Sequence, residues 1–160
     1  MEKYPGLFIK TALIYLLIGV IVGVAIGTNP MLAARLRFAH IHLNLLGFMI
    51  MIIAGVAYHV LPRFTARTMP WPGGVKYHFY LQNIGLLGML GTKLTDDIWT
   101  AGGKTIFVMF AVVTASGLFI MICNLFCVLL PRRSSYEDAK ESQMHLMKDC
   151  EEDCSPCSFR

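Results

Sequence analysis

Four long apolar runs dominate this chain of 160 residues and constrain its fold more than any other feature. They cover residues 7–27, 38–61, 77–92 and 105–130. Hydrophobic residues make up 56% of the chain and charged residues only 15%, against about 25% charged in an average soluble domain. Because a small domain buries a limited fraction of its surface, a soluble core cannot hide all four runs. The sequence therefore predicts a protein that lies in a membrane.

Three of the four apolar runs are long enough to cross a bilayer as helices, and the third run along the chain is borderline. A helix needs about 20 mostly apolar residues to cross the hydrocarbon core, and three of the runs reach this length. Run 77–92 reaches it if Lys76 and Lys93 extend to the interfaces, and a buried or re-entrant segment is the alternative. Run 7–27 ends in Gly27-Thr28-Asn29-Pro30 rather than at a signal-peptide cleavage site, so we expect this helix to be retained.

The loops between the runs are short and contain proline or glycine, so consecutive helices are expected to be antiparallel. The sequence predicts an all-α integral membrane protein, a four-helix up-down bundle over residues 1–131. Residues 132–160 are polar and are expected to form a cytoplasmic tail that contains cysteines.

The distribution of lysine and arginine predicts the orientation of the helices. One side has Lys3, Lys10, Arg63, Arg67, Lys76, Arg132 and Arg133, and the other has Arg35, Arg37, Lys93 and Lys104. Seven cations against four predict a multi-pass protein of the inner (cytoplasmic) cell membrane, with both termini in the cytoplasm. The net charge of +4 does not indicate nucleic-acid binding, because the cations cluster at the ends of apolar runs and form no basic stripe.

The start of the second run has the residues that a membrane helix has least reason to contain. His40 and His42 lie just inside the run, and Arg35 and Arg37 lie just outside it. Ionisable residues in membrane helices are costly and usually functional. At about 100° per residue, positions i and i+2 point about 200° apart, so the two imidazoles address different neighbours and do not easily share a metal ion.

Two uses of the histidine pair remain open. The pair can ligate two separate hemes, or one histidine can ligate a heme while the other serves a second site. A hydrogen bond across a helix pair is the purely structural alternative. The guanidinium groups of Arg35 and Arg37 suit heme propionates, and lipid headgroups are the alternative partners.

A longer motif extends from this pair along the same run. It reads His40-x-His42-x-x-x-x-Gly47, then Gly55-x-x-Tyr58, then Leu61-Pro62-Arg63. The motif resembles the tenth helix of subunit I of the cytochrome c oxidases and nitric oxide reductases, the heme-copper oxidase superfamily, and most of all its C-type members. In that family the first histidine ligates the high-spin heme and the second ligates the low-spin heme. The resemblance therefore implies that His40 and His42 are heme ligands.

The chain departs from that family in its size and in its histidines. It has four apolar runs where the oxidase subunit has far more helices, and its five histidines do not supply a copper cluster. Oxygen reduction is therefore not expected of the chain by itself. The resemblance implies a protein that binds heme b and transfers electrons, as a possible redox subunit of an oxidoreductase complex. A quinone or a cytochrome would be its redox partner.

The second axial ligand of such a heme is not evident in the chain. His59 lies 17 residues from His42 on the same run, about 25 Å away, and His78 begins the third run at the same face as His59. We therefore expect a methionine, a homodimer or higher oligomer, or another subunit to supply that ligand. His59 and His78 either form a second, inner site or are two interfacial histidines.

Glycines recur at helical spacing and have two interpretations. Gly19, Gly23 and Gly27 allow close helix approach, either at a dimer face or within the chain. The glycines of the second and third runs either leave room for a flat macrocycle or serve helix packing; they are Gly47, Gly55, Gly85, Gly88 and Gly91.

The tail ends in the spacing Cys150-x-x-x-Cys154-x-x-Cys157. Radical S-adenosylmethionine enzymes use this spacing, but they need a barrel domain that the chain lacks. Reduced cytoplasmic thiols can bind zinc or an iron–sulfur cluster, with His145 or a partner as the fourth ligand. A tail that binds no metal is the alternative.

Two other classes of function remain open. The chain is either a non-redox accessory or assembly subunit that retains the fold without heme, or a small metal-handling transporter. A transporter needs a polar path across the membrane, and Gln82, Asn83 and Asn124 are too few to indicate one.

Overall fold

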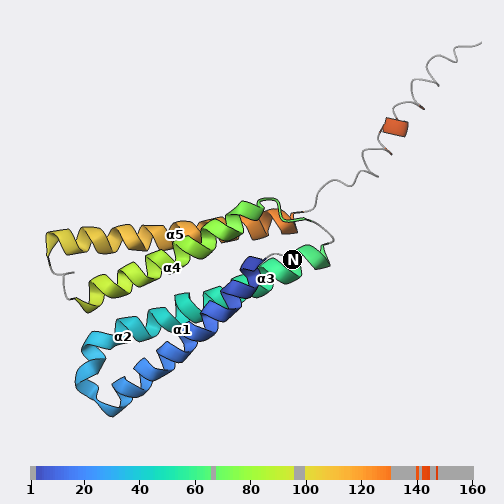
Figure 1. Ribbon diagram of the computed structural model, residues 1–160. Helices are drawn as coiled ribbons and strands as arrows, with labels where there is room; N and C mark the ends of the chain where they lie inside the picture. The colour runs from blue at the N-terminus through green and yellow to red at the C-terminus, as the bar shows by residue number, and fades with distance from the viewer. Residues whose placement is uncertain are drawn as a thin grey trace, which may run out of the picture. The chain divides into compact units, whose positions relative to one another are not determined.

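The computed structural model describes residues 3–65, 68–95, 100–130, 140, 142–144 and 147 (Figure 1). All regular structure within these residues is helical, which confirms the predicted all-α class. The chain divides into two units, residues 1–129 and 130–160. The cysteines of the tail and His145 lie outside the described residues, as do Arg67, Arg132 and Arg133.

The first unit contains all the long helices of the described residues. They are α1 (Lys3–Thr28), the 3-10 turn η1 (Pro30–Leu32), α2 (Ala33–His42), the π-helix η2 (Leu43–Met49), α3 (Ile50–Phe64), α4 (Pro72–Leu94) and α5 (Ala101–Leu129). The elements α2, η2 and α3 follow one another without a break and form one helix of 32 residues. Pro72 occupies the start of α4, where its missing N–H group has no intrahelical partner to lose.

Among the described residues, three helices are long and apolar enough to cross a membrane: α1, the continuous helix 33–64, and α5 from residue 102. Their outer faces expose large apolar side chains, such as Leu17 at 63% and Phe119 at 67%. Surface of this kind is unfavourable in water and favourable against lipid. These helices indicate a membrane protein. The 23 residues of α4 are not among the three, since polar and charged side chains interrupt its apolar sequence.

The helices pack as two close pairs. α4 lies along α5, and α1 lies along the continuous helix (Figure 1). Glycines make both approaches possible, because a Cβ on Gly85 or Gly88 would meet α5, and a Cβ on Gly55 would meet α1. A Cβ on Gly47 would lie 2.8 Å from Cγ of Tyr15. At these four positions the glycines serve helix packing, and nothing lies within 4 Å of such an atom on Gly91.

Hydrogen bonds between distant residues show which helix ends lie together. The Nη2 group of Arg35, at the start of α2, donates to the carbonyl of Leu94, at the end of α4, at 2.8 Å. The backbone N–H of Trp71, just before α4, donates to Oδ1 of Asn124 near the end of α5 at 3.3 Å. Asn124 Nδ2 donates back to the Trp71 carbonyl at 2.9 Å. The start of α4 therefore lies beside the end of α5.

Candidate functional site

His40 and His42 lie in the last turn of α2, where the π-helix begins. His40 Nδ1 is 2.9 Å from the carbonyl oxygen of Gly19 on α1. His42 Nδ1 is 2.9 Å from the carbonyl oxygen of Phe38, one turn earlier on the same helix. The two imidazoles therefore have different partners, one on a neighbouring helix and one on their own helix.

These hydrogen bonds determine where each imidazole has its proton. A carbonyl oxygen can only accept, so Nδ1 donates in both residues, and the lone pair of the neutral ring lies on Nε2. The longer contact of 3.4 Å between Asn44 Nδ2 and His40 Nδ1 then joins two donors and is not a hydrogen bond. Histidines that ligate metals donate their other ring N–H in this way. In both rings the Nδ1–H group is therefore used by a backbone carbonyl, and Nε2 has the lone pair.

The surroundings of the two rings differ. The His42 ring stacks on Phe38, with ring centroids 3.8 Å apart and an interplanar angle of 25°. Stacking holds the ring by its face, whereas Nε2 lies at the edge, and His42 is half-buried. The His40 ring lies against α1, where a Cβ on Gly23 would be 2.8 Å from His40 Cε1. Both imidazoles are half-buried, and they differ in what packs on them: a ring of the same helix at His42 and the α1 backbone at His40.

Gly19, Gly23 and Gly27 form a glycine stripe along α1, and this stripe leaves space for polar side chains of the neighbouring helix. A Cβ on Gly19 would lie 2.8 Å from Nδ2 of Asn44, just as one on Gly23 would meet His40. Asn44 Nδ2 in turn donates to the His40 carbonyl at 2.8 Å. Nothing lies within 4 Å of a Cβ on Gly27. Two of the three stripe positions are thus used for packing inside the chain.

The two arginines have different environments. Arg35 donates to the Leu94 carbonyl and thereby ties α2 to the last turn of α4. Arg37 is exposed. Both lie at the same end of the first unit as the histidine pair, because they precede it by one or two turns of the same helix.

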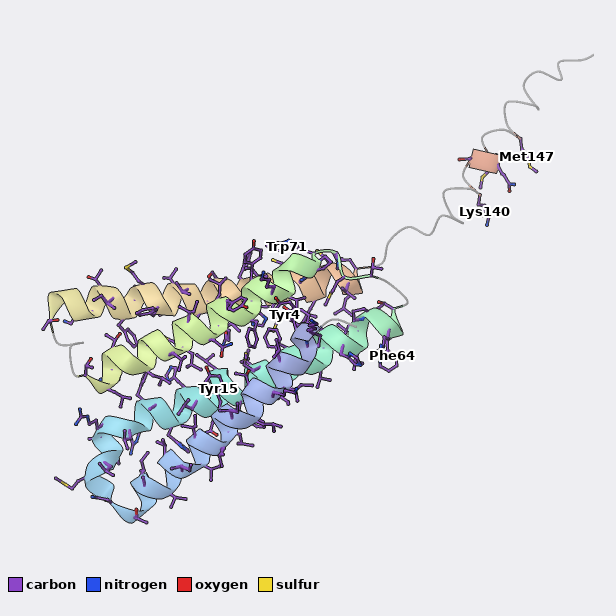
Figure 2. The ribbon with its side chains drawn as sticks, in the orientation of Figure 1. Tyr4, Tyr15, Phe64, Trp71, Lys140 and Met147 are labelled. Atoms are coloured by element: carbon purple, nitrogen blue, oxygen red, sulfur yellow. The ribbon has the colours of Figure 1, made fainter. Side chains whose placement is uncertain are left out.

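The π-helix is a feature that the sequence did not predict. Its seven residues begin directly after His42. π-helical segments are rare and occur frequently at functional sites. Tyr15, on α1 and labelled in Figure 2, lies against Gly47 in this segment, and its hydroxyl donates to Oδ1 of Asn83 on α4 at 2.7 Å. Tyr15 therefore links α1, the π-helix and α4.

We expect Tyr15→Phe to destabilise the protein by about 1 kcal/mol, the usual magnitude for a hydrogen bond between membrane helices. The ring and its packing against Gly47 remain, and only the bond to Asn83 is lost. Unfolding in one detergent measures the change. Tyr77→Phe is the control, since Tyr77 is 56% exposed and should change stability by less than about 0.5 kcal/mol. Equal effects of the two substitutions would contradict this role of Tyr15.

The structure does not pair His59 with His78. His78 is 0% exposed, and its Nδ1 lies 3.1 Å from the hydroxyl of Tyr58. His59 is exposed and, with Arg63, lines a cavity of about 620 Å³ beside the first residues of α1. Tyr58, the sequence neighbour of His59, is therefore the residue that meets His78.

Among the described residues, no group of three or more His, Cys, Asp or Glu side chains could hold a metal ion. The predicted zinc or iron–sulfur ligands Cys150, Cys154 and Cys157 lie outside those residues. No protein-family model, curated protein or solved structure matches the chain. The candidate site is therefore defined by its own geometry, the two histidines with Nε2 free for ligation.

Proposed function

We propose that the chain is a membrane b-type heme protein that transfers electrons, with His42 as an axial ligand. The observation that carries this proposal is the hydrogen bond from His42 Nδ1–H to the Phe38 carbonyl, which leaves the lone pair on Nε2. The Phe38 ring fixes the orientation of the imidazole. A heme bound there would supply the reversible one-electron change of its iron.

The other residues of the site have supporting roles in this proposal. His40 is the second candidate ligand, since its Nδ1–H donates to Gly19 and its Nε2 also has the lone pair. Arg37, exposed near the start of the same helix, is the better candidate for a propionate, because Arg35 already donates to α4. His59 and His78 are too far along the chain to ligate the same iron. We propose that a symmetric homodimer pairs His42 with its copy.

The proposal includes the arrangement of the helices in the membrane. All four long helices of the described residues cross the bilayer as an up-down bundle, with one face of α4 buried against its neighbours and the other exposed. The hydrogen bonds of Arg35 with Leu94 and of Trp71 with Asn124 support alternating helix directions. The cations at the two ends support cytoplasmic termini in an inner cell membrane.

An absorption spectrum tests the proposal. The full chain, expressed with adequate heme and purified in detergent, is expected to show a Soret band and the spectrum of a bis-histidine heme, at one heme per two chains. His42→Ala should lose at least nine-tenths of this heme, because even the loss of a residue that only supports a metal ligand typically lowers metal affinity about 10–100-fold. His59→Ala is the matched control and should retain it, because His59 is exposed at the other end of the continuous helix.

Three outcomes would contradict parts of the proposal. Wild-type protein without a Soret band would overturn heme binding and favour a non-redox accessory subunit. Unchanged heme in His42→Ala would overturn the assigned ligand. A monomer with a full heme complement would overturn the dimer.

A further inference from the structure

Two polar atoms in the core of the first unit have no hydrogen-bond partner among the described residues. They are Nε2 of His78 and Oε1 of Gln82. Both side chains are 0% exposed. The two residues are four apart on α4, so their side chains project from the same face of the helix, one turn apart. An unpaired polar atom in a dry interior is costly, so this arrangement calls for a ligand that satisfies both atoms.

Their neighbours define what each atom can do. The Tyr58 hydroxyl has His78 Nδ1 as its one partner among the described residues, at 3.1 Å. Either group can donate in this hydrogen bond, and we take the hydroxyl as the donor, an assignment that the experiment below checks. The neutral His78 ring then has its proton on Nε2, which becomes a donor. Gln82 Nε2 donates to the Leu46 carbonyl of the π-helix at 3.2 Å, which fixes the amide and leaves Oε1 as an acceptor. With this assignment the pair is one unused donor and one unused acceptor, one helical turn apart on α4.

The walls around this pair limit the size of its ligand. On one side α5 presents Gly117, where a Cβ would lie 3.5 Å from His78 Cδ2 and 3.3 Å from the backbone nitrogen of Gln82. The Phe8 ring packs on the His78 ring, with centroids 4.9 Å apart. Both polar side chains are closed off from solvent. Buried water molecules commonly satisfy polar atoms that are closed off from solvent in this way.

We propose that His78 and Gln82 bind one water molecule inside the first unit. The water accepts a hydrogen bond from His78 Nε2–H and donates one to Gln82 Oε1. It completes a hydrogen-bonded chain from Tyr58 of α3, through α4, to the Leu46 carbonyl of the π-helix. This site does not depend on heme binding, since none of its residues belongs to the proposed heme site.

Nuclear magnetic resonance of the full chain in detergent, with ¹⁵N-labelled histidine, tests the site. His78 is expected to be the neutral ring protonated at Nε2, with a cross-peak between that proton and water. Protonation at Nδ1, or an Nε2 proton without a cross-peak to water, would overturn the proposal. The wild-type spectrum alone therefore tests whether His78 and Gln82 bind a water molecule, even if a variant fails to fold.

Two variants sharpen the test. Gly117→Ala places a methyl group against His78 and Gln82, and Gln82→Met removes the acceptor at similar volume. Each is expected to reduce the water cross-peak at least tenfold. Gly102→Ala is the control on α5, because nothing lies within 4 Å of its added Cβ, and it should leave the cross-peak unchanged. An unchanged cross-peak in both test variants would overturn the site.

Discussion

Gly85→Ala is expected to destabilise the protein by about 3 kcal/mol, at the upper end of the usual range for overpacking. A Cβ on Gly85 would meet the Thr114 side chain and would lie 2.7 Å from the Thr114 backbone nitrogen and 2.9 Å from the Phe110 carbonyl oxygen. A side chain can rotate away from a new methyl group, but these backbone atoms cannot. The substitution must therefore separate α4 from α5 along much of their contact.

Gly91→Ala is the matched control for this prediction. It lies on the same helix, but nothing is within 4 Å of its added Cβ. Alanine is the better helix former, so we expect stabilisation of about 0.5–1 kcal/mol. Reversible unfolding of both variants in the same detergent measures the difference. Equal changes in stability would mean that α4 and α5 do not meet at Gly85.

Phe8→Ala is expected to cost about 3–5 kcal/mol, the usual loss when a fully buried phenylalanine is truncated. Phe8 is 0% exposed, and its ring centroid lies 5.7 Å from that of Tyr58 and 4.9 Å from that of His78. It also meets the Phe79 ring edge-on at 5.1 Å. Removing the ring leaves these side chains without contacts on one side, and lipid cannot enter to replace them.

The same unfolding measurement tests this prediction, with Leu13→Ala as the control. Leu13 lies on the same helix but is 53% exposed, so its truncation exchanges one lipid-facing side chain for another. We expect a change below about 0.5 kcal/mol for that control. A Phe8→Ala protein that unfolds like Leu13→Ala would show that α1 does not pack its aromatic face against α3 and α4.

The helices were largely predictable from the sequence. The apolar runs 7–27 and 105–130 correspond to α1 (Lys3–Thr28) and α5 (Ala101–Leu129), because an apolar run in lipid must satisfy its backbone within a helix. The helices extend past several run ends, since hydropathy marks the hydrocarbon core and a helix can continue beyond it. The third run shows this most clearly, because α4 begins five residues earlier, at Pro72.

The candidate site was predictable only in part. The divergence of His40 and His42 follows from helix geometry, and their different partners agree with it. No sequence signal marks the π-helix that follows them. The roles of the glycines were also undetermined, because one spacing suits a dimer face, a macrocycle or a packed helix equally well.

The sequence by itself determined that the protein is helical and that three helices of the described residues are long and apolar enough to cross a membrane, because both follow from the length and composition of each apolar run. Only the tertiary structure decided which polar side chains meet. Tyr58 and His59 are adjacent in sequence, yet Tyr58 forms a hydrogen bond with His78, whereas His59 is exposed. Adjacent helix residues point about 100° apart, so the rotation of each helix against its neighbours selects the partner. That rotation depends on contacts between residues far apart in the chain, such as Phe8 with Tyr58.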